Sequence, residues 1–201
     1  MKYTIITITE EMFDQLEKLA DQLWHESYGE LLSCGQINYM LRQFQCRKAF
    51  ERQTREGYIY RGLVIDGNLV GYTGSQQQGD RIFLSKLYLS KKYHGLGLGK
   101  ALLEDCISLY PECQAIYLTV NKYNPSYQIY RHLGFEVIDD VVTDIGEGYV
   151  MDDYISIQVL HLRNGNLTER DSYIYDLRQQ WKKYVLFLVI PRADGLYRDY
   201  D

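Results

Sequence analysis

The sequence has no stretch that could cross a membrane as a helix. Its longest apolar run, "YVLFLVI" at residues 184–190, is far shorter than the roughly 20 residues that a spanning helix needs. The N-terminal stretch "MKYTIITITEEM" alternates like a strand and then carries acids, which is not the pattern of a signal peptide. We therefore expect no membrane association and a cytoplasmic location.

The sequence also has no excess of basic residues. Its 22 lysines and arginines are outnumbered by 27 aspartates and glutamates, which gives a formal net charge of −5. Non-specific binding to nucleic acids depends on a basic surface. The composition therefore argues against a nucleic-acid partner.

Cysteines are few and scattered. None of the four, Cys34, Cys46, Cys106 and Cys113, belongs to a C-x-x-C pair, and no group of residues has the spacing of zinc ligands. Cys106 falls in an apolar helical pattern, which is typical of a buried free thiol. We expect reduced thiols, as in cytoplasmic proteins, and no bound metal.

The chain of 201 residues is long enough for one domain with a hydrophobic core, or for one domain plus a small appendage. Its 20 tyrosines outnumber its six phenylalanines. A tyrosine ring can be buried while its hydroxyl meets a polar partner, so this excess favours amphipathic core edges and a lined cleft.

The N-terminal half predicts a strand, two helices and a meander. Residues 2–8 alternate like a strand, and Thr9 can cap the helix that follows. "SCGQ", from Ser33, has the capping-box pattern ahead of a second helix, and further helical sequence runs to Glu56. Asp66-Gly67 is a strong hairpin signal, and a second turn leads into "RIFLSKLYL", so three antiparallel strands are expected.

The C-terminal half predicts a helix ending at Pro111, a strand over residues 114–120, a short helix ending at Gly134 and a final pair of strands. The two strands that flank the first of these helices are joined by a short crossover, so they should run parallel. The fold class is therefore α/β, with a mixed and mostly antiparallel sheet and flanking helices.

Three glycines precede the helix in "YHGLGLGKALL", at Gly95, Gly97 and Gly99. The spacing G-x-G-x-G is neither that of a P-loop nor that of a dinucleotide fingerprint. Backbone without Cβ atoms at a helix start can approach an anion closely, and Lys100 adds a full charge. We interpret the loop as a pyrophosphate cradle; the alternative is a tight turn without a ligand.

Two blocks, "LSKLYLSKKYHGLGLGKALLEDC" and "IYLTVNKYNPSYQIYRHLGFE", resemble the GNAT superfamily of acetyl-CoA-dependent acetyltransferases. The first is similar to its R/Q-x-x-G-x-G/A signature, with His94 in place of the usual arginine or glutamine. The second is similar to its pattern of asparagine, tyrosine and Leu-Gly-Phe, here Asn124, Tyr130 and Leu133 onward. "VTDIGEGYVMDDY" and an N-terminal W-x-E-x-Y, at Trp24, resemble a bacterial subgroup of acetyltransferases.

This resemblance implies a GNAT fold over residues 1–160, in which the strand before the glycine loop splays from the next parallel strand. The pantetheine arm of acetyl-CoA would bind that strand, and its pyrophosphate the glycine loop. The implied cofactor residues are Leu87, Tyr88, Leu89, His94, Gly95, Leu96, Gly97, Leu98, Gly99, Lys100 and Asn124.

The resemblance also implies the chemistry. Tyr130 would protonate the thiolate that leaves, and a backbone N–H at Leu89 or its neighbour would stabilise the oxyanion. Many relatives carry a glutamate on the strand where this chain has Ser85 and Lys86. We therefore name Glu26 as the catalytic base. His25, Asp152 and Asp153 are the alternatives.

We thus expect transfer of an acetyl group to a primary amine of a small molecule or a peptide. The alternatives are transfer of another acyl group, and a sensor that binds acyl-CoA without turnover. Residues 161–201 form a C-terminal extension beyond the usual domain. Thr168 can cap a helix there that runs to about Lys183, and "YVLFLVI" can add a strand. The sequence leaves a homodimer open.

Overall fold

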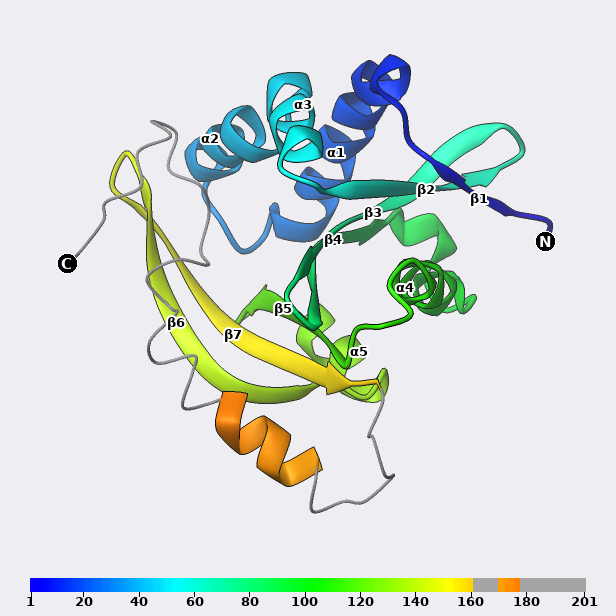
Figure 1. The fold of residues 1–201 in the computed structure, drawn as a ribbon. Helices are drawn as coiled ribbons and strands as arrows, with labels where there is room; N and C mark the ends of the chain where they lie inside the picture. The colour runs from blue at the N-terminus through cyan, green and yellow to red at the C-terminus, as the bar shows by residue number, and fades with distance from the viewer. Residues whose placement is uncertain (161–169, 178–201) are drawn as a thin grey trace.

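A computed structural model describes residues 1–160 and 170–177 (Figure 1). One sheet of seven strands has the order β1-β2-β3-β4-β5-β7-β6. The strands are β1 (Thr4–Thr7), β2 (Ile59–Ile65), β3 (Asn68–Gln78), β4 (Arg81–Leu89), β5 (Ala115–Asn121), β6 (Glu136–Gly146) and β7 (Tyr149–Val159). The α-helices labelled in Figure 1 are α1 (Phe13–Tyr28), α2 (Cys34–Phe44), α3 (Arg47–Arg55), α4 (Leu98–Ser108) and α5 (Ser126–His132).

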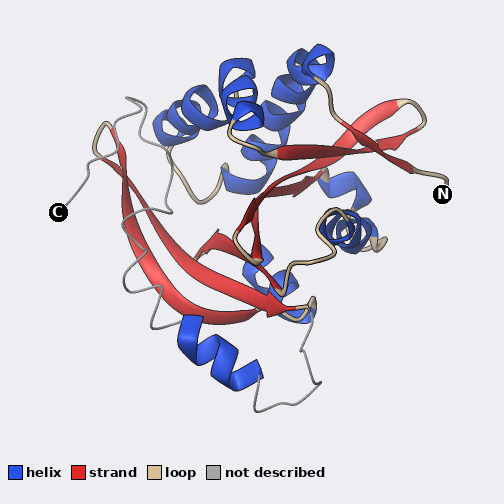
Figure 2. Cartoon of the chain, viewed as in Figure 1, coloured by secondary structure: helices blue, strands red, loops and turns tan. Residues whose placement is uncertain are grey.

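The sheet is mixed, as predicted. β4 and β5 are parallel, whereas every other neighbouring pair in the described chain is antiparallel. In this parallel pair, Arg81–Phe83 of β4 pair with Ala115–Tyr117 of β5, and the pairing goes no further. Beyond it the two halves of the sheet diverge, and Figure 2 shows the strands in red separating. A register shift between Gly74 and Ser75, opposite β4, marks the kind of irregularity that bends a strand.

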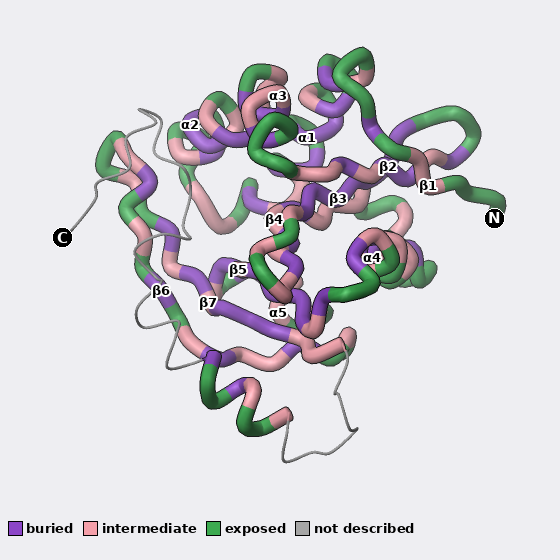
Figure 3. The backbone as a smooth tube through the Cα atoms, in the orientation of Figure 1, coloured by how far each residue is buried: buried purple, intermediate pink, exposed green. Residues whose placement is uncertain are grey.

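Helices cover both faces of the sheet (Figure 1). Apolar side chains of α1 and α3 pack on β2 and β3, while α4 and α5 pack on the other face against β4 and β5. Figure 3 shows that the buried stretches follow the strands and the inner sides of the helices. This is the layered arrangement by which amphipathic helices bury their apolar stripes.

The predicted helix caps differ in outcome. Ser33 accepts a hydrogen bond from the backbone N–H of Gln36, at 3.1 Å, as predicted. The Gln36 side chain does not return to close a capping box, because it donates to the carbonyl oxygen of Val150 at 2.9 Å. Thr9 makes no side-chain cap, because a 3₁₀ turn at Glu10–Met12 intervenes before α1 begins.

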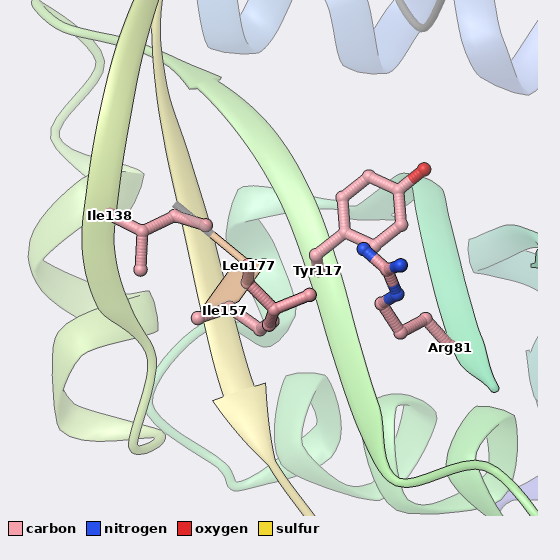
Figure 4. Close-up of a pocket in the computed structure, with 5 residues that line it drawn as sticks. All are labelled: Arg81, Tyr117, Ile138, Ile157 and Leu177. Carbon is pink, nitrogen blue, oxygen red and sulfur yellow. The ribbon is translucent and has the colours of Figure 1, made fainter. Parts of the chain in front are cut away.

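Residues 170–177 form a helix that packs against the β5–β7–β6 half of the sheet. Its buried side chains are Ile174 and Leu177, and the Tyr173 hydroxyl donates to Asp80 at 3.2 Å. Figure 4 shows Leu177 beside Arg81, Tyr117, Ile138 and Ile157 around a hollow too narrow for water. The predicted helix is thus present over this range; the Thr168 cap, the end near Lys183 and the strand at "YVLFLVI" lie outside the described residues. The boundary between the expected acetyltransferase domain and the C-terminal extension, after residue 160, stays a prediction.

We expect Leu177→Ala to lower the free energy of unfolding by about 2–4 kcal/mol, because it removes a buried side chain from the contact between helix and sheet. The affinity for acetyl-CoA should not change, since the glycine loop lies in another part of the fold. Tyr175→Ala is the control, because Tyr175 is 61% exposed in the same helix. Denaturant titration and calorimetry would measure the two effects. Equal stability of both variants would contradict the packing described here.

No helix of the described residues 1–160 and 170–177 is long and apolar enough to span a membrane.

Candidate active site

The gap between β4 and β5 exposes the backbone of β4. The N–H of Ser90 donates to the carbonyl oxygen of Val70, at 3.0 Å, across the β3–β4 ladder. Backbone groups alternate in direction along an antiparallel strand. The polar groups of Leu87 and Leu89 therefore face away from β3 and into the gap, while those of Tyr88, which stands opposite Tyr72, face β3. The N–H groups of Leu87 and Leu89 and the carbonyl of Leu87 thus face the gap, while the Leu89 carbonyl is occupied by His94.

The glycine loop ends at the start of α4. Gly95 and Gly97 both have φ of +75°, a left-handed conformation that glycine adopts without strain. Gly97 is the N-cap, and the first helical bond of α4 runs from the N–H of Ala101 to the Gly97 carbonyl, at 3.1 Å. The N–H groups of residues 98–100 therefore have no acceptor within the helix, which is the arrangement that binds anions.

The loop leaves open space where side chains would be. A Cβ atom added at Gly95, Gly97 or Gly99 would meet no other atom of the described chain within 4 Å. Gly99 has no positive φ either, so neither the packing of this chain nor its backbone geometry requires glycine there. A ligand that approaches the backbone closely would explain a glycine at this position, and the open loop has room for a pyrophosphate.

His94 connects the loop to β4. Its Nε2 lies 2.9 Å from the carbonyl oxygen of Leu89. The histidine thus holds the loop against the strand end.

Lys100 has only a loose ion pair with Glu104, at 3.6 Å, and its side chain is 64% exposed. The Lys100 side chain can therefore turn toward an anion bound at the loop. Leu96 is exposed in the same loop, where its side chain can contact a bound ligand.

Aromatic rings of α1 and β4 meet beside the gap. The ring of Trp24 lies 4.7 Å from that of Tyr28 and 5.9 Å from that of Tyr88, between ring centroids. The polar groups of Tyr88 and Asn124 lie close enough to the Tyr28 hydroxyl to lower its pKa slightly, against the larger effect of burial. Burial, and then the charge of Asp153, raise the pKa of Tyr28 to about 12. These phenols therefore stay protonated near neutral pH.

Tyr130, the predicted catalytic acid, belongs to this cluster. Its ring meets Phe135 nearly edge-on at 5.6 Å, and its hydroxyl is close enough to those of Tyr28 and Tyr88 to interact electrostatically. Burial, and then Tyr28, raise the pKa of Tyr130 well above its ordinary value. A phenol held neutral at the gap can donate a proton to a thiolate.

Asn124 positions the helix that carries Tyr130. Its Oδ1 accepts the backbone N–H of Ser126, at 2.9 Å, in the first turn of α5. The Asn124 side chain also lies close enough to Tyr28, on α1, to influence the pKa of that phenol. Its predicted contact with the cofactor stays a prediction.

Asp153 lies on β7 opposite Asn121, near the end of β5 that has left β4. It is only 6% exposed, and its Oδ1 has no hydrogen-bond partner among the described residues. Burial, and then the neighbouring Asp152, raise its pKa to about 7, while Lys122 opposes that rise. The sequence suggested Asp153 only as an alternative, because nothing in a strand pattern shows which of two adjacent aspartates is buried.

The predicted base Glu26 lies at the end of α1. Its Oε2 accepts the backbone N–H of Lys91, at 3.1 Å, and its Oε1 accepts the side chain of Gln22, at 2.7 Å. These bonds join α1 to the segment that follows β4. His25 turns back on its own helix, with Nδ1 2.8 Å from the carbonyl oxygen of Asp21. The catalytic role of Glu26 stays a prediction.

Lys86 is a buried lysine on β4 that the sequence analysis noted only as a departure. It is 3% exposed, and its Nζ donates to Oε1 of Gln53 at 2.9 Å. The ammonium also lies 5.4 Å from the centre of the Tyr60 ring. Burial, and then Arg52, lower its pKa to about 7. An apolar strand pattern interrupted by one lysine was the signal that could have drawn attention to it.

The described residues contain no cluster of three or more histidine, cysteine, aspartate or glutamate side chains that could hold a metal ion.

Comparisons with known proteins agree with this geometry. The model of the "Acetyltransferase (GNAT) family" matches residues 16–135. A spermine/spermidine N(1)-acetyltransferase of Bacillus subtilis (strain 168) is 27% identical over 120 residues, which cover 52% of this chain and 76% of that protein. The PaiA N-acetyltransferase from Thermoplasma acidophilum, solved in complex with coenzyme A, is similar with a TM-score of 0.67 at 20% identity, covering 80% of this chain and 100% of that one.

The ribosomal-protein-S18-alanine N-acetyltransferase of Escherichia coli has a TM-score of 0.59 at 19% identity, over 83% of this chain and 99% of that one. The similar solved structures support the fold, and the family match covers more than half of the chain. The splayed strands, the glycine cradle and these matches lead to one conclusion: the chain belongs to the GNAT family and is an acetyl-CoA-dependent N-acetyltransferase.

Proposed function

We propose that this enzyme acetylates a primary amine of a small polycationic molecule, a polyamine, by direct attack of the amine on acetyl-CoA. The observation that carries the proposal is the buried Asp153 carboxyl group, which lies close enough to Tyr28 to influence its pKa, while the Tyr28 ring itself packs against that of Trp24. Carboxylates and aromatic faces both attract ammonium groups. The curated relatives, named for spermine and spermidine, support the same class of acceptor.

The cofactor would complete the sheet at the gap. We place the pantetheine arm along β4, where the backbone groups of Leu87 and Leu89 face outward, in the manner of an added strand. The pyrophosphate would rest on the loop of residues 94–100. Tyr88 would contribute its ring rather than its backbone, because its backbone is directed toward β3.

The chemistry follows from this placement. An N–H of β4 that faces the gap, at Leu87 or Leu89, would stabilise the oxyanion of the tetrahedral adduct. Tyr130 would protonate the sulfur as the thiolate leaves. Tyr28 and Tyr88 hold the surroundings of that hydroxyl in place.

The β6–β7 hairpin supplies further negative charge. Asp144 and Glu147, near its tip, are close enough to Tyr39 to raise the pKa of that phenol, although burial contributes most. Hydrogen bonds from Tyr39 to the Ile145 carbonyl and from Gln36 to the Val150 carbonyl hold the hairpin against α2. We propose that these carboxylates receive a second ammonium group of the acceptor.

Release of free thiol from acetyl-CoA across a panel of amines tests the proposal. We expect turnover with triamine and diamine acceptors, and a kcat/KM about tenfold or more lower for a monoamine of matched length, because one charge–charge contact is lost. A lysine peptide tests the peptide alternative. Binding of acetyl-CoA without thiol release from any amine would instead support a sensor, and release only with another acyl-CoA would support the other acyl group.

We also infer that the chain belongs to the bacterial subgroup with the "MDDY" motif, since that motif contains the buried Asp153. We also propose a cytoplasmic location, a metal-free reaction and no nucleic-acid or membrane partner, with a homodimer as an open alternative to a monomer. The net charge of −5 supports the preference for cationic small molecules over nucleic acids.

A further inference from the structure

We propose that Asp153 is the catalytic base of this reaction: it removes a proton from the ammonium group of the acceptor before the amine attacks the thioester. The inference rests on the proposed function, because it requires an amine acceptor. It adds a residue on β7 to a site otherwise built from α1, β4 and α5.

The position of Asp153 suits that role. It stands opposite Asn121, at the end of β5 where the strand has separated from β4, and it influences the pKa of Tyr28, a phenol that in turn interacts with Tyr88 and Tyr130. Its carboxylate is therefore on the side of the sheet that α1 covers, close to the phenols at the gap. A buried carboxylate oxygen without a hydrogen-bond partner is costly unless another group satisfies it. An acceptor ammonium would supply the missing donor.

The other ionisable groups have partners that hold them elsewhere. Glu26 accepts two hydrogen bonds, and His25 points to its own helix. Oδ1 of Asp152 lies 2.7 Å from Nζ of Lys122. Lys86 is directed toward Gln53 on α3.

Charges on three elements set the state of Asp153. Asp152, on β7, disfavours its ionised form, and Lys122, after β5, favours it. Tyr28, on α1, faces it as a neutral phenol. Asp140 and Asp152 already neutralise Lys122, at 2.5 and 2.7 Å, and Asp153 forms no ion pair of its own within residues 1–160 and 170–177. It can therefore take up and release a proton near neutral pH.

The proton balance is complete with the groups present. The acceptor ammonium gives its first proton to the Asp153 carboxylate, which later passes it to water. The neutral amine then forms the C–N bond, and the C–S bond breaks as the adduct collapses. The sulfur takes the proton of Tyr130, and the second proton of the nitrogen restores the Tyr130 phenol.

Asp153→Asn keeps the shape of the side chain and removes its basicity. With an aliphatic amine at pH 7, we expect kcat/KM to fall by roughly 10²–10⁴, the usual contribution of a general base, with unchanged affinity for acetyl-CoA. The loss should be much smaller with an amine whose own pKa lies below the assay pH, because that acceptor arrives unprotonated. A purely structural role would impair both amines equally.

The pH profile supplies a second test that does not require the Asp153 variant to fold. In the wild type, kcat/KM should rise with pH through about 7 as Asp153 ionises. Asp152→Asn removes a negative neighbour, so it should lower the pKa of Asp153. The rise of kcat/KM should then occur at lower pH, while the enzyme stays active. The inference would be overturned if kcat/KM of Asp152→Asn rose at the same pH as in the wild type, or if Asp153→Asn had wild-type rates. Either result would leave the proposed acetylation of an amine standing. A wild type that releases no thiol with any amine would overturn both.

Discussion

Tyr130→Phe should lower turnover by roughly 10²–10⁴ while the affinity for acetyl-CoA hardly changes. The substitution keeps the edge-on contact of the ring with Phe135 and removes only the hydroxyl. A positioned acid usually contributes this much to a rate. Since the proton is needed only as the thiolate leaves, kcat and kcat/KM should fall together. Steady-state thiol release and calorimetry measure the two quantities.

Tyr127→Phe is the matched control for Tyr130. Tyr127 lies on the same short helix, and its ring packs on that of Tyr154 at 5.0 Å. Removing its hydroxyl should leave turnover within a few-fold of the wild type. Equal, small effects of both substitutions would show that Tyr130 is an ordinary core tyrosine and that another group protonates the sulfur.

Gly97→Glu should weaken acetyl-CoA binding by about 100-fold or more. Gly97 caps α4 with φ of +75°, next to N–H groups that have no acceptor within the helix. A carboxylate there would occupy the space in which we place the pyrophosphate and would repel it. Losing even one charge-assisted hydrogen bond costs about 1.5–3 kcal/mol, or roughly 10–100-fold in affinity.

Gly67→Glu separates this effect from backbone strain. Gly67, in the β2–β3 turn, has φ of +77° and equally open surroundings, so the substitution brings the same strain and the same charge. It should destabilise the fold by a similar amount without touching cofactor affinity. If calorimetry finds the wild-type affinity in a folded Gly97→Glu protein, the cradle lies elsewhere.

Local patterns predicted much of the fold. Asp66-Gly67 gave the β2–β3 hairpin, Ser33 capped α2, and the crossover through the glycine loop produced the parallel β4–β5 pair. One of the two cap errors arose from a contact distant in sequence, whereas the other, at Thr9, was local. Gln36 leaves the capping box for a carbonyl 114 residues away, because the β6–β7 hairpin folds onto α2. No spacing within the first 60 residues contains that information.

The site divides in the same way. The glycine loop and Tyr130 belong to linear motifs, so their numbers could be read directly from the sequence. The state of Asp153 depends instead on three strands and a helix coming together, with Lys122 already neutralised by its neighbours. Burial of Lys86 likewise depends on Gln53 and the aromatic rings of a different segment. Such properties appear only once the chain is folded.

The outward-facing backbone of Leu87 and Leu89 bears on how this family diverges. Main-chain N–H and C=O groups are the same in every residue except proline, so a ligand held by them places little restriction on side-chain identity. The leucine side chains remain free to follow changes in the core against α4. Substitutions along this strand should therefore leave the main-chain contacts that we propose for the cofactor in place, whereas any side chain at the loop glycines would enter the open space beside the start of α4.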